Sequence, residues 1–372
     1  MNSIVNTLLL AVKELRSIRS DKVMMFLIFY VFTVATYVVA DAISTEVVNL
    51  STVVVDEDHS ALSQRLTQTI RGPLFKAPDE VSAKVAENGL TYGAYVLSVT
   101  IPPNFERDLR SGKRATLSIE ADATAIALAG NGATFMQQLI ADEVTKYFAR
   151  GSGQASLVNV VFHNQFNPNL TSKWFSSVMQ LMNSVTIITL ILSGASMIRE
   201  RERGTIEHVL VMPVRPHEIV FSKILANGVV ILVSSIFSLI FVVNMLIGVP
   251  INGSLLLFTA GTALYVVSVA SLGLMLASFT HSMGQFGLLA IPTIIVMILL
   301  SGGMTPLESM PGWLQGLMTA ISPAMHFVRF TQSVLYRGSG LDLVAGEMLA
   351  MALMASAALG IVLARFRKVL AG

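Results

Sequence analysis

The sequence predicts a polytopic α-helical membrane protein with six transmembrane helices and an inserted α/β domain on the non-cytoplasmic side. Three observations lead to this fold class. Of the 372 residues, 53% are hydrophobic and 13% are charged, whereas about 25% of an average soluble protein is charged. Six apolar runs lack charged side chains, and a 133-residue stretch between the first two alternates strand-like and helix-like segments. A soluble fold of this size could not cover its surface with so few charges.

Each of the six apolar runs comes close to, or exceeds, the roughly 20 helical residues that cross a bilayer core. None of them contains Asp, Glu, Lys, Arg or His. This absence argues against proton pumps and ion-coupled carriers, which usually require an acid or base inside the membrane. The runs are residues 23–40, 174–197, 224–249, 255–279, 285–300 and 348–364.

The distribution of Lys and Arg predicts that both termini are cytoplasmic. The side that holds the termini and residues 199–223 carries 12 Lys and Arg against 6 Asp and Glu, and the opposite side carries 13 against 17. Residues 41–173 therefore lie outside. Residues 1–22 form a cytoplasmic amphipathic helix, which either lies in the membrane interface or extends the first span. Its apolar stripe is Val5, Leu8, Val12, Leu15 and Ile18.

The outer domain, residues 41–173, shows strand patterns separated by helical patterns. Such alternation predicts an α/β sheet, although one sequence does not give the order of its strands. Residues 302–341, before the last span, are too polar for a full crossing and too apolar for a plain loop. We expect them to form a re-entrant or interfacial helical pair on the outer side. The expected strands are 51–55, 95–101, 115–119 and 157–162, and the expected helices 59–70, 81–88, 104–110 and 124–149.

No group of residues predicts catalysis or a cofactor in this chain. Without cysteine, disulfides, thiol nucleophiles and cysteine–zinc sites are excluded. The segment 112–114 lacks the glycine spacing of a phosphate-binding loop, and the six histidines are dispersed, so we expect neither an enzyme nor a metal site. Asn183, Asn227 and Asn244 are the notable polar residues in or near the spans. They either form interhelical hydrogen bonds or line a substrate path.

The segment 199–215, which follows the second span, is the most informative. Alternating charges end the span, and Gly204 then breaks the helix. Thr205 can cap a new short helix, with Glu207 in its first turn and Pro213 at its end. Such a helix suits docking into a partner's groove, but a solvated positive-inside loop explains the pattern equally well. The charged and polar residues before and within it are Arg199, Glu200, Arg201, Glu202, Arg203 and His208.

This segment resembles the cytoplasmic motif of type-2 ABC exporter permeases, in which charged residues precede Gly-Thr, then Glu, then Pro. Further similarities follow in order along nearly the whole chain. They are closest to the bacterial subgroup with a large periplasmic domain, described as multidrug-type inner-membrane permeases. No single motif decides the resemblance; the order and spacing do. The similar segments are 13–22, 55–60, 101–105, 166–169, 321–327 and 335–340.

The resemblance implies a mechanism and a set of partners. Two permease subunits, identical or paralogous, would pair with two ATPase subunits that bind ATP and Mg²⁺, so this chain would hold no cofactor. The helix around Thr205 and Glu207 would couple ATPase closure to the spans, with Gly204 as its turn and residues 199–203 as polar contacts. The periplasmic domain, residues 41–173, is larger than a plain loop requires, so we expect it to dock an adaptor protein. No nucleic-acid partner is expected.

Two functions compete at this point. The first is an exporter's membrane subunit in the bacterial inner membrane, moving hydrophobic or amphiphilic small molecules, drug-like or lipid-like. The second is a membrane-anchored sensor or scaffold that binds a ligand with its outer domain. A sensor needs a cytoplasmic output domain, and the longest predicted cytoplasmic stretch is the segment 199–223. The exporter is therefore favoured, with transmembrane helix 1 at residues 23–40 and transmembrane helices 2–6 within residues 174–372.

Overall fold

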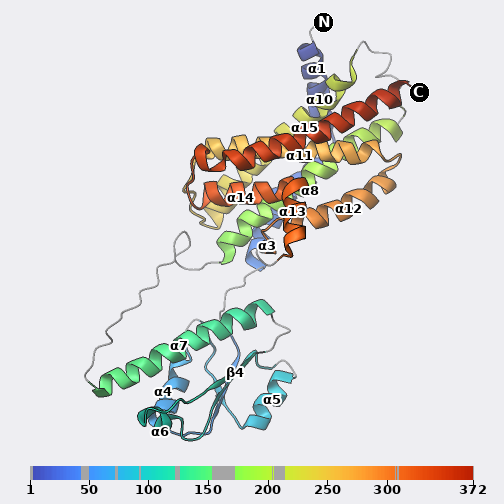
Figure 1. The fold of residues 1–372 in the computed structure, drawn as a ribbon. Coiled ribbons are helices and arrows are strands. Elements are labelled where there is room, and N and C mark those ends of the chain that lie inside the picture. The colour runs from blue at the N-terminus through green and yellow to red at the C-terminus, as the bar shows by residue number, and fades with distance from the viewer. Residues whose placement is uncertain are drawn as a thin grey trace. The chain divides into compact units, whose positions relative to one another are not determined.

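The computed structural model describes residues 3–42, 50–71, 74–91, 94–121, 126–152, 172–202, 204, 214–305, 307 and 310–371. The chain forms two compact units. One combines Met1–Ser44 with Lys173–Gly372, and the other is Thr45–Ser172. The first unit is helical, and the second is built on a sheet (Figure 1).

The helical unit contains long apolar helices with shorter helices around them. Helices α2, η1 and α3 follow one another without a break, as do α10 and η3. The bounds are α1 Ser3–Ser20, α2 Lys22–Tyr30, η1 Val31–Ala35, α3 Thr36–Ala42, α8 Ser172–Glu202, α10 Pro216–Phe237, η3 Ser238–Leu246, α11 Leu255–Ser278, α12 Met283–Leu299, α13 Gly312–Ile321, α14 Pro323–Leu335 and α15 Leu341–Ala371.

Within the described residues, five helical stretches are long and apolar enough to cross a membrane. Helix α12, with 17 residues, is about 26 Å long, slightly shorter than a hydrocarbon core of about 30 Å. The prediction of a polytopic helical membrane protein with an inserted α/β part is confirmed, with α12 as a short sixth apolar helix. The five stretches are Lys22–Ala42, Lys173–Glu202, Pro216–Leu246, Leu255–Ser278 and Leu341–Arg365.

The start of the third long helix differs from the sequence prediction. The apolar run begins at residue 224, but α10 begins at Pro216. Pro216 at the first helical position is favourable for helix initiation, and the Glu218 carboxylate accepts a hydrogen bond from the Arg215 backbone N–H at 2.9 Å. As a result, α10 contains two buried charged residues, Glu218 and Lys223. Both residues precede the apolar run 224–249, which itself contains no ionisable residue.

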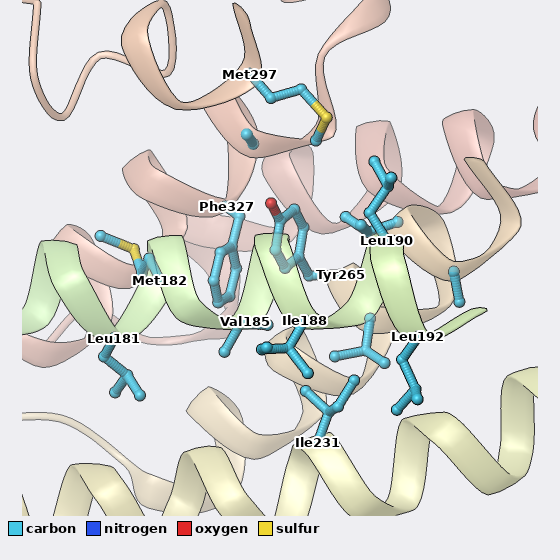
Figure 2. Close-up of a cluster of buried hydrophobic side chains, with 14 of the residues drawn as sticks. Leu181, Met182, Val185, Ile188, Leu190, Leu192, Ile231, Tyr265, Met297 and Phe327 are labelled. Carbon is cyan, nitrogen blue, oxygen red and sulfur yellow. The ribbon is translucent and has the colours of Figure 1, made fainter. Parts of the chain in front are cut away.

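Helix α8 runs through the core of the helical unit. Figure 2 shows Ile188 and Leu192 of α8 directed toward Ile231 of α10, with Tyr265 and Phe327 on the opposite side of α8. The Tyr265 and Phe327 rings stack with their centroids 3.9 Å apart. This packing makes α8 the most buried of the long helices described. A movement of α8 would therefore displace the side chains packed against it.

The segment after α12 forms the expected pair of helices, and the two differ in burial. Trp313 of α13 is exposed, whereas most of α14 is buried, including Phe327 and Phe330. Helix α14 packs against α11 and α15. Helix α14 is therefore part of the core, although it carries polar residues such as His326 and Thr331, both of which are buried.

The second unit is a four-stranded sheet with helices on both faces. The strands are β1 Thr52–Asp56, β2 Asp79–Glu80, β3 Leu97–Ile101 and β4 Ser118–Ala121, and their order is β2-β1-β3-β4. β1 pairs in parallel with β2 and β3, and β4 pairs antiparallel to β3. The helices are α4 Ala61–Thr69, α5 Ala83–Thr91, α6 Phe105–Arg110 and α7 Ile126–Ser152.

Alternating side chains of the strands form two separate cores. Val54 and Val99 face a core shared with α4 and α7, whereas Val53 and Val55 face α5. This is the period-two pattern of a sheet buried on both faces. Strand β2 was not predicted, and β4 begins three residues later than expected. The expected strand at residues 157–162 lies outside the described residues.

Candidate functional site

The predicted coupling segment begins inside α8. The helix continues through the charged residues Arg199–Glu202, beyond the apolar run. Gly204 then has a φ of +66°, and its N–H bonds to the Arg201 carbonyl at 3.2 Å. A glycine in this left-handed conformation is a common helix terminator. The remaining predicted residues, Arg203, Thr205, Glu207, His208 and Pro213, lie outside the described part of the chain.

A buried ammonium group joins the end of α8 to two other helices. The Lys223 Nζ of α10 lies 2.8 Å from Glu200 Oε2 of α8 and 3.2 Å from Glu14 Oε1 of α1. It also donates to the Ser196 carbonyl at 3.3 Å. Lys13 adds a longer contact of 3.6 Å to Glu200. An ammonium has three N–H donors, and here each has an acceptor.

The burial of this group makes its contacts strong constraints. The Lys223 side chain is 3% exposed, and an unpaired buried charge is strongly unfavourable. Burial raises the pKa of the Glu14 carboxyl, and the Lys223 ammonium opposes that rise. Helices α1, α8 and α10 must therefore stay in register at this point. We call Glu14, Glu200 and Lys223 the ionic triad.

The next two residues of α8 connect the end of the helix to the chain between α11 and α12. Arg201 donates to the Thr280 carbonyl, just after α11. Glu202 accepts a hydrogen bond from the Met283 N–H, the first residue of α12, at 2.8 Å. Three consecutive residues of α8 thus contact other elements. Glu200 contacts α10 and α1, Arg201 contacts the α11–α12 connection, and Glu202 contacts the start of α12. A displacement of the chain after Glu202 would pull on all of these elements.

Helix α1 is held along α10 by polar contacts as well. The Asn6 amide donates to Glu218 Oε2 at 3.3 Å, and Ser3 Oγ lies 3.2 Å from His217 Nε2. Of the predicted apolar stripe, only Ile18 is buried, and Val5, Leu8 and Val12 are exposed. The reason is that the face of α1 that packs on α10 meets buried charged residues, and polar side chains of α1 form hydrogen bonds and ion pairs with them. The exposed apolar stripe of α1 remains suited to a lipid interface.

The three asparagines do not form one site in the described structure. Asn227 is 1% exposed, and its amide nitrogen has no hydrogen-bond partner among the residues that the structure describes. It lines a cavity of about 270 Å³ with Glu14, Asp21 and Arg199. The Asn244 amide donates to the Val249 carbonyl at 2.8 Å. These two residues are 17 positions apart, or about 25 Å along a helix. Asn183 is half-buried on α8.

A second partly buried ionic contact joins α14 to α15. His326 Nδ1 pairs with Glu347, and Nε2 lies 2.9 Å from the Thr319 carbonyl oxygen. Arg329 approaches the other Glu347 oxygen at 3.8 Å. The hydrogen bond with Glu347 raises the pKa of His326, against the effect of burial. No group of three His, Cys, Asp or Glu side chains that could hold a metal ion occurs among the described residues.

Sequence reasoning identified the α8 end but missed its partners. The sequence places Glu14 on the amphipathic helix 1–22, outside its apolar stripe, and Lys223 at the end of the cytoplasmic segment 199–223. No pattern in the sequence marks these two residues as partners, because they are 209 positions apart. Thr280 and Met283 contribute backbone atoms, so their side-chain identities carry no information about the contact.

Comparison with known proteins gives a consistent result. A family model described as "ABC-2 family transporter protein" matches residues 22–364. The chain is 39% identical to "Inner membrane transport permease YhhJ" of Escherichia coli (strain K12), over 99% of this chain and 98% of that protein. It is 30% identical to "Probable multidrug ABC transporter permease YbhR" of the same organism, over 82% of each chain. The similarity to "Probable multidrug ABC transporter permease YbhS" is 24%, over 89% of this chain and 88% of that protein.

Proposed function

Because the chain belongs to the ABC-2 family of transporter proteins, we propose that it is the membrane subunit of an ATP-driven exporter for hydrophobic or amphiphilic small molecules. It is an inner-membrane transport permease without an ATPase domain, and nucleotide is bound by partner ATPase subunits. The proposed substrates leave from the cytoplasm or from the inner membrane itself. The names of two relatives, both called probable multidrug permeases, support this substrate class.

The proposal rests on the contacts that residues at the end of α8 make with other helices. Glu200, Arg201 and Glu202 connect the segment that follows α8 to α1, α10 and the α11–α12 connection. In the proposed mechanism residues 199–215 form the coupling segment, in which a short helix with Thr205, Glu207 and His208 follows the end of α8 and meets the ATPase. Closure of the ATPase then moves α8 and, through the ionic triad, the helices around it.

The proposed topology and assembly follow from the same mechanism. Both termini and residues 199–215 lie in the cytoplasm, the α/β domain at residues 41–173 lies in the periplasm, and the helical pair within 302–341 lies on the outer side. Two permease subunits, identical or paralogous, assemble with two ATPase subunits. The α/β domain is the docking site for a periplasmic adaptor, since it is larger than a plain connection requires.

A reconstituted complex tests the function. The chain is purified with its ATPase, placed in proteoliposomes and supplied with ATP and a panel of hydrophobic compounds. We expect the ATPase to co-purify, and hydrolysis to rise severalfold with transported compounds. The chain without the ATPase should show no hydrolysis. Stable isolation without any ATPase partner, or hydrolysis that no compound stimulates, would contradict the proposal.

The adaptor interaction is tested separately by deletion of residues 50–165. The deleted chain should still bind the ATPase, because the coupling segment is intact, but it should no longer retain the adaptor. Co-purification from membranes measures both interactions in one experiment. Retention of the adaptor by the deleted chain would refute the docking role of the α/β domain.

A further inference from the structure

The polar cavity of about 270 Å³ that Asn227 lines lies where α1, α2, α8 and α10 meet. Its volume is just below the roughly 300–1,000 Å³ that is usual for sites of drug-sized ligands, so it suits a small polar group. Seven of the nine lining residues are charged or polar. The lining residues are Glu14, Ser17, Ile18, Ser20, Asp21, Met24, Ser196, Arg199 and Asn227.

Arg199 is the free cation of this cavity. Unlike the three residues that follow it on α8, it forms no ion pair or hydrogen bond with the residues that the structure describes. Its guanidinium is a planar fork of N–H donors that matches two oxygens of a phosphate. Ser17, exposed on α1, adds a hydroxyl that has no partner in the described part of the chain. The amide nitrogen of Asn227 is enclosed by protein, so Arg199 and Ser17 are the donors that a ligand meets.

Asp21 is the free anion of the cavity. It caps α2, because one carboxylate oxygen, Oδ1, accepts a hydrogen bond from the Met24 N–H at 3.1 Å. The other oxygen has no partner among the described residues, and the residue is exposed. Glu14, the second carboxylate of the wall, already pairs with Lys223 at 3.2 Å. Within the described residues, the wall therefore presents one unpaired positive group and one unpaired negative group.

Both charges lie at the boundary between polar and apolar chain. Asp21 stands two positions before the first apolar run, and Arg199 stands two positions after the second. Lipid headgroups occupy this level, because they flank the hydrocarbon core of a bilayer. Apolar surface continues from Met24 along α2, where Phe26 is 67% exposed and Leu27 is 47% exposed. A headgroup in the cavity would leave its acyl chains against this surface.

Charge complementarity selects among the ligands of suitable size. A phosphate without a cation would be attracted by Arg199 and repelled by Asp21, and a lone cation would be repelled by Arg199. A phosphate ester with a neighbouring primary ammonium satisfies both side chains, since such an ammonium has three N–H donors for the carboxylate. The quaternary ammonium of choline has no N–H donor and meets Asp21 less well.

We propose that this cavity binds a phosphate ester with a neighbouring primary ammonium, the chemistry of phosphoethanolamine. The phosphate meets Arg199 and Ser17, and the ammonium meets Asp21. Both the membrane lipid phosphatidylethanolamine and a soluble ester without acyl chains have this chemistry. Binding in the cavity does not depend on the export function proposed above.

Native mass spectrometry of the purified full-length chain in detergent tests the proposal. The chain is titrated separately with dioleoyl phosphatidylethanolamine, dioleoyl phosphatidylcholine and dioleoyl phosphatidylglycerol, and each bound lipid is seen as an increase in mass. We expect one phosphatidylethanolamine per chain to bind saturably. Its dissociation constant should be at least about tenfold lower than those of the other two lipids, because only its ammonium donates hydrogen bonds to Asp21.

Two substitutions separate the two halves of the headgroup. Arg199→Gln should raise the dissociation constant of phosphatidylethanolamine at least about tenfold. Arg19→Gln, which removes the same charge from an exposed position outside the cavity, should leave it unchanged. Asp21→Asn keeps a good cap for α2 but removes the negative charge, so the preference for phosphatidylethanolamine over phosphatidylglycerol should be lost. Asp342→Asn, at an exposed carboxylate in the first turn of α15, should retain that preference.

A further variant blocks the cavity without touching either charge. Ser17→Phe places an aromatic ring at an exposed position of the wall, so it should abolish the saturable binding of one lipid even if Arg199→Gln does not fold. Val12→Phe is its control, because Val12 is also exposed on α1 but does not line the cavity. Val12→Phe should bind phosphatidylethanolamine like the wild type.

Competition with glycerophosphoethanolamine, which has the headgroup but no acyl chains, distinguishes the two sources. Displacement of the lipid by a similar concentration of this compound identifies a soluble ester as the ligand, and retention of the lipid identifies a membrane lipid. Both results support the site. Equal retention of the three lipids by the wild type, or an equal response to Arg199→Gln and Arg19→Gln, would overturn it. Retention of the saturable lipid by Ser17→Phe would place the binding elsewhere and overturn it as well.

Discussion

Lys223 shows how one side chain can decide the arrangement of three helices. Its ammonium contacts Glu14, which is 209 positions earlier in the chain, and Glu200. In the sequence it stands at the boundary of an apolar run, where a basic residue is usually explained by the positive-inside rule. Only the packing of α1 and α8 on α10 distinguishes a buried partner from an exposed one.

The substitution Lys223→Met leaves the carboxylates of Glu14 and Glu200 buried without their cation. We expect the free energy of unfolding to fall by about 3–5 kcal/mol, the usual effect of breaking a buried ion pair. Unfolding of the purified chain in mixed micelles with increasing dodecyl sulfate measures the change. Lys22→Met is the control, since Lys22 is exposed, and it should unfold like the wild type. Equal stability of both variants would show that the triad is not a constraint.

The candidate site was predictable in part at the level of single residues. The alternating charges at Glu200, Arg201 and Glu202, which follow the second apolar run, indicated where α8 ends. Their partners were not predictable, since two are backbone atoms of Thr280 and Met283. The family resemblance, which the family match confirms, pointed to the same segment.

At the scale of elements, hydrophobicity located the middle of each helix better than its ends. Pro216 and Glu218 start α10 well before the apolar run, and local capping decides that boundary. Strand β2 consists of Asp79 and Glu80, both exposed, so no hydrophobic alternation marks it. The burial of α14 was also missed, because its packing against α11 and α15 depends on long-range contacts.

The contact of α14 with α15 should depend on pH. The pKa of His326 is raised in the folded chain by Glu347, so protonated His326 stabilises the fold below the ordinary value of about 6.5. This stabilisation is lost as the pH rises through the higher folded pKa. As the pH rises, the free energy of unfolding of the wild type should fall by about 1 kcal/mol relative to that of His326→Gln. This corresponds to a fall of about 2–4 °C in thermal midpoint.

Thermal unfolding in detergent between pH 6 and pH 8.5 measures this difference. His281→Gln is the control, because His281 is exposed, and it should follow the wild type at every pH. A constant difference between the wild type and His326→Gln across this range would show that the pairing with Glu347 does not respond to protonation.

For the whole molecule, charge distribution predicts an orientation that single-cysteine labelling can test. The chain has no cysteine, so an introduced one is the only thiol. Lys84→Cys in the α/β unit should react with a membrane-impermeant maleimide added to intact spheroplasts. Ser20→Cys, at the end of α1, should react only after the membrane is permeabilised. Both positions are exposed, and the reverse pattern would invert the topology.

In the proposed mechanism, residues 199–215 transmit the movement of the ATPase to the membrane spans. Glu207→Lys reverses the charge of one residue there while leaving the ionic triad unchanged. Transport and ATP hydrolysis are measured together in proteoliposomes that contain the chain and its ATPase. We predict hydrolysis within about twofold of the wild type and a loss of transport per ATP of at least about tenfold, or more than 1.4 kcal/mol in coupling. Normal transport per ATP by Glu207→Lys would contradict the coupling role.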